Sequence, residues 1–144
     1  MKYLASLLSL VVFIVVSYGQ DKSELQDETE SLTGPKIYFT EISFDFGDIS
    51  QGDKVEHVFE FENTGNEPLI LSDVRTTCGC TAPEWPREPI VPGTKAKLKV
   101  RFNSTGKMGV QNKVITVMSN AVNSPARVKI ITNVLPKESG GRSY

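Results

Sequence analysis

A strict alternation of apolar and basic side chains over residues 94–102 constrains this chain more than any other feature. The alternating residues are Lys95, Ala96, Lys97, Leu98, Lys99, Val100, Arg101 and Phe102. Because successive side chains on a β-strand point to opposite faces, this pattern predicts a strand with one buried face and one basic, solvated face. Residues 55–62 alternate in the same way and predict a second strand, whose outer face is acidic through Glu56, Glu60 and Glu62.

Four further segments are rich in β-branched and aromatic residues, which favour strands. These segments are residues 42–46, 69–75, 110–118 and 127–134. Glycine, asparagine and proline clusters bound them and predict turns, one of them at Gly47-Asp48. No segment shows a sustained helical period. Six or seven strands in about a hundred residues predict an all-β fold, an immunoglobulin-like antiparallel β-sandwich of about seven strands, with a small closed barrel as the alternative.

Residues 1–19 have the pattern of a secretory signal peptide. Lys2 precedes an apolar run over residues 4–16, and Ser17 and Gly19 supply the small residues of a cleavage site. The apolar run of about thirteen residues is shorter than the roughly 20 that a membrane-spanning helix needs. We therefore predict cleavage after Gly19 and a periplasmic or secreted mature protein that does not insert into a membrane.

Composition divides the rest of the chain into three parts. Residues 20–35 are rich in acids and poor in apolar side chains, which predicts a flexible tether. Residues 36–135 hold the predicted strands, and residues 136–144 lack an apolar run and are predicted to be a disordered tail. The formal net charge of -1 lacks the basic footprint of a nucleic-acid binder, so we expect no nucleic-acid partner.

Acidic residues concentrate before residue 74 and basic residues after it. The basic strand, together with Lys107 and Lys113, could therefore form a patch for an anionic polymer. Alternatively, this strand lies beside the acidic strand in one sheet, where opposite charges on neighbouring strands contribute roughly 0.2–1 kcal/mol per pair. An immunoglobulin-like strand order makes the two strands neighbours, which favours the second interpretation.

Residues 76–92 depart from the plain sandwich pattern, because they contain both cysteines, the single Trp85 and four prolines. Prolines fix φ and remove backbone donors, so we expect a rigid, extended loop rather than an interior strand. Trp85 is interpreted either as a lid over one end of the core, which the usual burial of tryptophan favours, or as an exposed contact in a binding loop.

The motif Cys78-Gly79-Cys80 allows four interpretations. A disulfide fits an oxidising compartment, although closing so short a loop contributes only about 1.6 kcal/mol by chain entropy. A Cu(I) site suits two thiolates, with Met108 or Met118 as further ligands, whereas zinc needs more ligands than the single histidine adds. A redox pair lacks the usual Cys-x-x-Cys spacing and the βαβ context. The fourth interpretation is a turn in which Gly79 supplies unusual backbone angles and both thiols pack as small apolar groups.

Other catalytic chemistry is sparse. His57 and Glu56 are neighbours on a strand, so their side chains point to opposite faces, and we expect a half-buried His57 with a partner of its own. The sequence contains no phosphate-binding glycine loop, no Gly-x-Ser-x-Gly and no His-Glu-x-x-His motif. We therefore expect no enzyme activity, no catalytic residues, no cofactor and no resident metal.

Several motifs, taken in order, resemble a known family. They are FDFGDISQGDKVEHVFEFENTGNEPLIL, TTCGCTAPEWP, IVPG, FNSTGKMG and ITVMSNA, within residues 42–135. They resemble bacterial secreted proteins known as domain of unknown function 1573. The resemblance implies an immunoglobulin-like β-sandwich, similar to those of major sperm protein and Hydin-type modules, and it implies no activity. Cys78, Cys80 and Trp85 match the family pattern without a known role.

These observations lead to the hypothesis of an exported, non-catalytic immunoglobulin-like module that binds or spaces a protein or another component of the cell envelope or the extracellular space. The contact would use an edge strand or the loop from Cys78 to Trp85. The alternative hypothesis is a thiol site at Cys78 and Cys80 that binds Cu(I) or exchanges disulfides.

Overall fold

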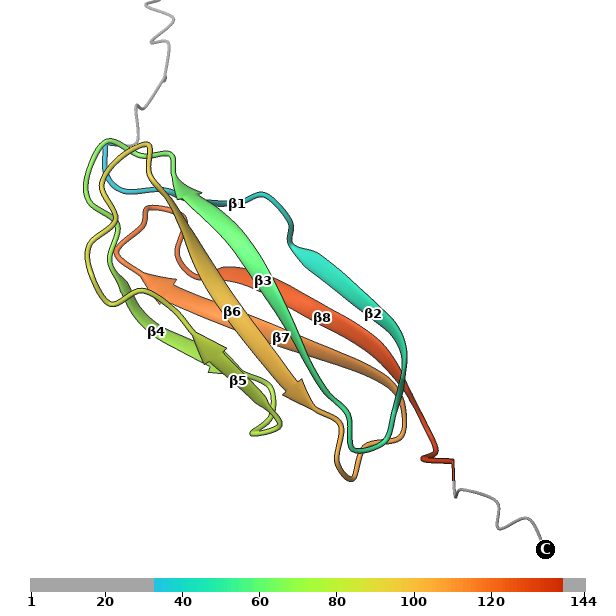
Figure 1. The fold of residues 1–144 in the computed structure, drawn as a ribbon. Helices are drawn as coiled ribbons and strands as arrows, with labels where there is room; N and C mark the ends of the chain where they lie inside the picture. The colour runs from blue at the N-terminus through green and yellow to red at the C-terminus, as the bar shows by residue number, and fades with distance from the viewer. Residues whose placement is uncertain (1–32, 139–144) are drawn as a thin grey trace, which may run out of the picture. The chain divides into compact units, whose positions relative to one another are not determined.

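The computed structural model of this protein describes residues 33–138, which form eight β-strands (Figure 1). The strands are β1 (Ile37–Phe39), β2 (Ser43–Ser50), β3 (Lys54–Asn63), β4 (Leu71–Thr76), β5 (Thr81–Glu84), β6 (Lys95–Asn103), β7 (Gly109–Ser119) and β8 (Ala126–Leu135). The first sheet has the strand order β1-β3-β6-β5 and the second sheet the order β2-β8-β7-β4. Because the two sheets are separate, the fold is a sandwich rather than the closed barrel considered as the alternative.

The predicted signal peptide over residues 1–19 lies outside the described residues, as do nearly all of the predicted tether and most of the predicted tail. Over residues 33–138, no helix has the length and the apolar character that a membrane span requires.

All six strands predicted from alternation and composition are present, and the immunoglobulin-like sandwich is confirmed. The structure adds two strands for which the sequence offers little signal. β1 has only three residues, and β5 contains Pro83, which an edge strand tolerates because one side of its backbone has no neighbour in the sheet. Neighbouring strands are antiparallel except for β2 and β8, which run parallel.

The alternating residues place large apolar side chains between the two sheets. Phe59 and Phe61 from β3 and Phe102 from β6 are the largest of the fully buried side chains. From the second sheet, the buried residues of β7 and β8 are Ile115, Val117, Val128, Ile130, Thr132 and Val134. Burial stabilises the fold by about 1.5–3 kcal/mol for each large apolar side chain, so these contacts hold the two sheets together.

Gly47 lies inside β2, so the predicted turn at Gly47-Asp48 is wrong. The register between β2 and β8 shifts between Asp45 and Asp48, which is the mark of a β-bulge. Gly47 has a φ of 69°, a left-handed conformation that residues with a side chain rarely adopt. Its nitrogen donates to Asp45 Oδ1 at 2.8 Å, and its oxygen accepts from Thr132 Oγ1 at 2.8 Å. Glycine beside a short polar residue signals either a turn or a bulge, and the pairing with β8 decides between them.

Candidate functional site

The two cysteines lie where the chain crosses from one sheet to the other. β4 ends in the second sheet and β5 begins in the first, so residues 77–80 make the crossing (Figure 1). The nitrogen of Thr77 donates to Val114 O at 3.2 Å, and the nitrogen of Asn103 donates to Cys80 O at 2.9 Å. One end of the crossing is thereby bound to β7 and the other to β6, which holds the cysteine backbone in place.

In the structure, the sulphur atoms of Cys78 and Cys80 are joined as a disulfide, and the two Cα atoms are 5.3 Å apart. Both side chains are half-buried, and Cys80 packs against the edge of the core. Thr81, which is 4% exposed, lies with its Oγ1 3.7 Å from Cys78 Sγ. A disulfide sulphur carries no hydrogen, so the threonine hydroxyl is the donor. The oxidation state of the cysteines in the cell stays a prediction.

Gly79 does not have the unusual backbone angles that one interpretation of the motif expected. Its φ lies outside the left-handed region, and a Cβ at this position would meet no atom within 4 Å. Thr76 shapes the turn instead, because its hydroxyl donates to Cys78 O at 2.8 Å. The backbone of the motif is therefore an ordinary turn, and its special chemistry is in the two sulphur atoms.

A groove of ≈ 370 Å³ opens beside Cys80 at one end of the first sheet. Its lining residues are Lys54, Val55, Glu56, Gly79, Cys80, Ala82, Arg101, Phe102 and Asn103. Within this lining, Ala82 on β5 stands beside Arg101 on β6, so a short side chain lies next to a long one. Cys80 is among the residues that line the groove and Cys78 is not, so the two cysteines have different surroundings.

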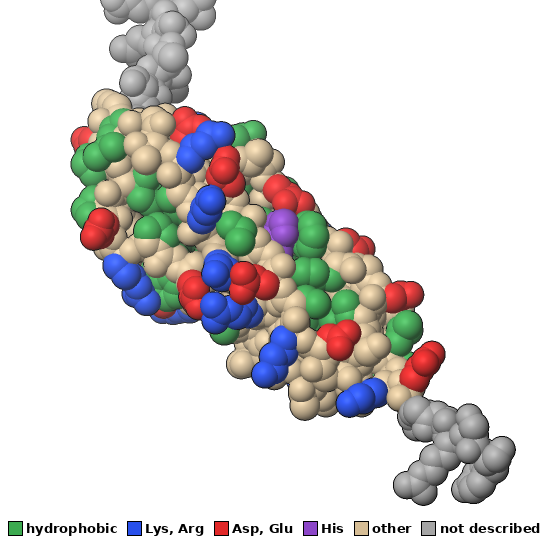
Figure 2. Space-filling model, viewed as in Figure 1, with side chains coloured by type: hydrophobic (Ala, Val, Ile, Leu, Met, Phe, Trp, Pro, Cys, Tyr) green, Lys and Arg blue, Asp and Glu red, His purple; other side chains and the backbone are tan. Residues whose placement is uncertain are grey.

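The outer face of the first sheet carries ion pairs between neighbouring strands. Lys95 Nζ lies 2.9 Å from Glu60 Oε1, and Arg101 lies 2.8 Å from Glu56 Oε2 and 2.7 Å from Glu84 Oε1. Figure 2 shows basic and acidic side chains interleaved over this side of the molecule. The prediction that the acidic and basic strands lie side by side is confirmed. Much of the positive charge considered for an anionic polymer is balanced within the sheet.

These pairs shift the ionisation of their members. The Arg101 guanidinium, which donates a hydrogen bond to Glu56, and the charge of Lys99 hold the pKa of the Glu56 carboxyl below its ordinary value. In return, the hydrogen bond to Glu56 and the charge of Glu84 raise the pKa of Arg101. Because these groups are exposed, solvent and salt screen their attraction, and each pair contributes little to stability.

Trp85 follows β5, packs against the hydrophobic core and stays half-buried. The guanidinium of Arg87 lies over its ring, with Cζ 3.8 Å from the ring centroid. The indole Nε1 is buried and has no hydrogen-bond partner within the described residues. Because a buried donor without an acceptor is costly, the indole N–H is a polar group that the packing of this loop leaves unsatisfied.

His57 lies on the inner side of β3 and is half-buried, as expected. Its ring stacks on Phe44 with the centroids 3.6 Å apart and meets Phe59 edge-on at 4.7 Å. Its Nε2 lies 3.0 Å from Glu41 Oε2, in the passage between β1 and β2. Glu56 points to the opposite face, where it pairs with Arg101. The histidine thus packs and hydrogen-bonds within the sandwich, away from its sequence neighbour.

Met118, one of the further ligands considered for a metal, lies away from the two cysteines. Met118 stands opposite Asp73 near the start of β4, whereas the cysteines follow the end of that strand. Met108 lies in the turn between β6 and β7 and is exposed. Within residues 33–138, no group of three or more His, Cys, Asp or Glu side chains is placed to hold a metal ion.

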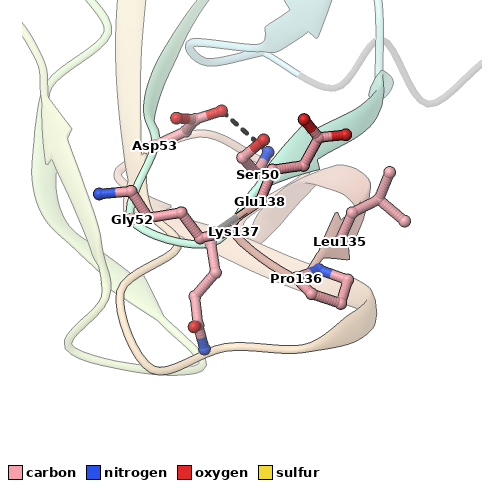
Figure 3. A pocket seen from close by; sticks show the side chains of 8 residues that line it. Ser50, Gly52, Asp53, Leu135, Pro136, Lys137 and Glu138 are labelled. Atoms are coloured by element: carbon pink, nitrogen blue, oxygen red, sulfur yellow. Dashed lines mark hydrogen bonds between the residues drawn. The ribbon is translucent and has the colours of Figure 1, made fainter. Parts of the chain in front are cut away.

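A second hollow, of ≈ 450 Å³, lies at the turn between β2 and β3 (Figure 3). Its lining residues are Ser50, Gln51, Gly52, Asp53, Leu135, Pro136, Lys137 and Glu138. The nitrogen of Ser50 donates to Asp53 Oδ2 at 2.9 Å, as drawn in Figure 3, and the nitrogen of Gln51 donates to Leu135 O at 2.9 Å. These backbone nitrogens already have partners within the protein, so they are not available to bind a ligand in this hollow.

Sequence reasoning missed the asparagines that close the opposite end of the sandwich. Asn63 is fully buried, and its Nδ2 donates to Glu67 O at 2.7 Å and to Ile90 O at 2.9 Å. It is the last residue of β3, whose first residue, Lys54, lines the groove. The others that bind the backbone of neighbouring segments are Asn66, Asn120 and Asn123. We name this the asparagine end and the end with the disulfide and its groove the cysteine end.

The fold places the protein in the class of immunoglobulin-like and PapD-like sandwiches. It resembles PapD-like domain 7 of human CEP192 at a TM-score of 0.58 and 15% identity, over 83% of this chain and 99% of that chain. Residues 37–134 match the family model described as protein of unknown function (DUF1573). The chain belongs to this family, as its motifs indicated.

Larger proteins contain the same sandwich. A protein of unknown function from Porphyromonas gingivalis W83 is similar at a TM-score of 0.62 and 20% identity, over 72% of this chain and 48% of that chain. The secreted serine protease VesC from Vibrio cholerae is similar at a TM-score of 0.55 and 14% identity, over 69% of this chain and 23% of that chain. At these identities the similarity shows the fold alone. No curated protein matches the sequence.

Proposed function

We propose that this protein is an exported, non-catalytic immunoglobulin-like module that binds or spaces a protein or another component of the cell envelope or the extracellular space. Export is supported by the signal-peptide pattern of residues 1–19. A non-catalytic role is supported by the site chemistry of residues 33–138, where His57 is held by Glu41 and by aromatic rings, and the acids of the first sheet pair with its bases.

The observation that carries the proposal is the open edge of β5, the strand that the proline-rich loop with Trp85 follows. β5 is an edge strand, so one side of its backbone has no neighbour within the first sheet. A partner that lies along β5 would reach both this backbone and the tryptophan. We therefore place the contact at the loop from Cys78 to Trp85, with no nucleic acid and no membrane insertion involved.

Partner capture from envelope extracts tests this assignment. The bait is the mature protein, the variant Trp85→Ala, and the control Val110→Ser, which changes a side chain 75% exposed on β7 of the other sheet. We expect the wild type and V110S to recover the same component and W85A to lose it by at least about tenfold, as for a central aromatic contact. Equal capture by W85A, in a variant shown to be folded by circular dichroism, would contradict the proposed surface. Recovery of no component, where a known envelope complex survives, would contradict the function.

Export has its own measurement. The intact mass of the protein recovered from outside the cytoplasm should correspond to a chain that begins at Gln20. A full-length chain that stays with the cytoplasmic fraction would contradict both the cleavage site and the localisation.

A second candidate function, a thiol site at Cys78 and Cys80, is favoured by the groove that reaches Cys80. The bridge joins residues two apart in sequence and so contributes little to stability by chain entropy. Alkylation before and after reduction reports the oxidation state, and titration of the reduced protein with Cu(I) against a competing chelator reports metal binding. Stoichiometric binding that the double variant Cys78→Ser/Cys80→Ser abolishes would support a copper site. A pair that neither binds Cu(I) nor exchanges with added thiols would remove this candidate.

A further inference from the structure

The two sulphur atoms of the bridge have different surroundings, which gives them different roles. We infer that Cys80 is the sulphur attacked in thiol–disulfide exchange, that Cys78 departs as a thiolate held by Thr81, and that the groove admits a small anionic thiol. This inference rests on the thiol-site candidate function. It adds to that function the direction of attack and the class of substrate.

Their position relative to the groove distinguishes the two cysteines. An attacking thiolate must reach one sulphur of the bridge from the side away from the other, so the accessible sulphur decides which bond forms. Cys80 lines the groove and Cys78 does not. At ≈ 370 Å³, the groove lies within the range of about 300–1,000 Å³ typical of small-molecule sites. A small thiol that enters it meets Cys80 first.

The leaving group is distinguished by a hydrogen bond. Thr81 Oγ1 lies 3.7 Å from Cys78 Sγ, and no hydrogen bond of the described residues reaches Cys80 Sγ. A disulfide sulphur is a weak acceptor, whereas a thiolate accepts a charge-assisted hydrogen bond, so the Thr81 hydroxyl stabilises the departed Cys78 thiolate more than the intact bridge. The backbone of Cys78 is held at the same time, because its oxygen accepts from Thr76 Oγ1 at 2.8 Å and from the nitrogen of Thr81 at 3.3 Å.

Charge at the groove selects the substrate. Two of its lining residues, Glu56 and Arg101, neutralise each other through a contact of 2.8 Å. Lys54, at the start of β3, takes part in none of the ion pairs formed among residues 33–138. The unbalanced charge at the groove is therefore positive and favours a thiol that carries an acidic group.

The exchange takes two steps, each an attack of a thiolate on a disulfide sulphur. The substrate thiolate forms a bond to Cys80 Sγ with its own electron pair, and the bond between Cys80 and Cys78 breaks. The electron pair of that bond leaves with Cys78, which becomes a thiolate. A second substrate thiolate that attacks the substrate sulphur of the mixed disulfide releases the oxidised substrate dimer and Cys80 as a thiolate. The protein disulfide is the oxidant, and the two substrate thiols are oxidised.

The attacked sulphur is identified by trapping the mixed disulfide. The oxidised mature protein is mixed with 2-mercaptoethanesulfonate, quenched rapidly in acid, alkylated and fragmented between residues 78 and 80 for mass spectrometry. We expect the thiol adduct on Cys80 and the alkyl group on Cys78. An adduct that forms first on Cys78, or equally on both, overturns the assignment of roles while it leaves a thiol site in place.

The hydroxyl of Thr81 is tested with Thr81→Val, which keeps the shape of the side chain, and Thr81→Ser, which keeps the hydroxyl. We expect T81V to slow reduction by 2-mercaptoethanesulfonate about tenfold and T81S to restore most of the rate, since a hydrogen bond to a charged group is lost and regained. We also expect a raised pKa of the Cys78 thiol in T81V, read from the pH dependence of alkylation in a Cys80→Ser background. Equal rates and equal pKa values in the three proteins overturn the role of Thr81.

The substrate class is tested with three thiols of similar size: anionic 2-mercaptoethanesulfonate, neutral 2-mercaptoethanol and cationic cysteamine. After correction for each thiol's thiolate fraction, we expect the anionic thiol to react several-fold faster than the cationic one and Lys54→Gln to abolish that difference. The same order in K54Q and wild type overturns the charge argument. If dithiothreitol reduces the bridge but none of the three thiols does, exchange in this groove fails, and with it the thiol-exchange function.

Discussion

The two ends of the sandwich are closed by different chemistry. At the asparagine end, amide side chains bind the backbone of neighbouring loops, and Asn63 alone donates to two carbonyl groups from inside the protein. At the cysteine end, the buried Ser104 binds the turn between β2 and β3. Its hydroxyl lies 2.9 Å from Ser50 O and 3.0 Å from Asp53 O. Beside that turn lies the groove with Cys80.

This contrast shows which end of the molecule has groups free to contact a ligand. An end whose buried donors and acceptors are satisfied internally gains rigidity and offers little to a ligand. The cysteine end keeps a groove and a half-buried sulphur bridge. β5 leads away from this end, and the tryptophan after it has an unpartnered N–H. Stability is therefore expected to depend most on the asparagine end, and binding or thiol chemistry on the other.

The largest effect is expected from Asn63→Ala. The change removes a buried amide and leaves Glu67 O, Ile90 O and the nitrogen of Gly65 without this partner. At about 1–3 kcal/mol for an unsatisfied buried group, we expect a loss of about 3 kcal/mol in the free energy of unfolding, measured by urea denaturation. The matched control Asn120→Ala, at an exposed position, should lose about 1 kcal/mol. Equal losses in the two variants would contradict the special place of Asn63.

Ser104→Ala should have a smaller effect at the cysteine end. It removes one hydroxyl, whose two contacts are to Ser50 O and Asp53 O, while the backbone nitrogen of Ser104 keeps its own bond to Asp53 O at 2.9 Å. We expect a loss of about 1–2 kcal/mol in the free energy of unfolding. A loss larger than that of N63A would reverse the comparison between the two ends.

Removal of the disulfide should lower the free energy of unfolding by a still smaller amount. In the double variant Cys78→Ser/Cys80→Ser, the crossing keeps its hydrogen bonds to β6 and β7. We expect a loss of no more than about 1.6 kcal/mol, because the bridge closes only a three-residue loop. Thermal unfolding of the variant beside the wild type measures it. A variant that fails to fold would show that the bridge is structural, which would weaken the thiol-site candidate.

The smallest effect is expected on the pH dependence of stability, through the ion pairs on the outer face of the first sheet. The pKa of Glu56 is lower in the folded protein than its ordinary value, so the folded state binds the proton less readily than the unfolded state does. Its contribution to stability is therefore present above the ordinary value of 4.5 and is lost as the pH falls through the folded pKa. In urea denaturation at a series of pH values, Glu56→Gln should lose slightly less free energy of unfolding than the wild type as the pH falls below 4.5. Added salt should reduce this difference between the two proteins. The same pH dependence in E56Q and wild type would contradict the role of Glu56.

Prediction from the sequence succeeded where the information is local. The alternation in β3 and β6 predicts both strands, their inward phenylalanines and the acidic strand beside the basic one, because these features depend on a period of two and on opposite charge. Prediction failed where the partner is distant. The backbone nitrogen of Ile37 donates to Asn123 Oδ1, 86 residues away in the sequence, so the role of that asparagine has no local signal.

The candidate site divides in the same way. The sequence alone identified Cys78, Cys80 and Trp85 as unusual, since a run with both cysteines, the tryptophan and four prolines interrupts a simple strand pattern. It could not distinguish the two sulphur atoms, because both are the same residue type in one short motif.

The amino-acid sequence by itself determined the all-β class, the strands with alternating faces and the family, because these depend on periodicity and on short motifs. Only the tertiary structure decided that Gly47 forms a bulge, that asparagines lock one end, and that Cys80 lines a groove while Cys78 meets the Thr81 hydroxyl. The physical reason is that the alternation of a strand depends on residues that are adjacent in the sequence. A groove or a hydrogen bond between loops forms only when the two sheets bring distant segments together.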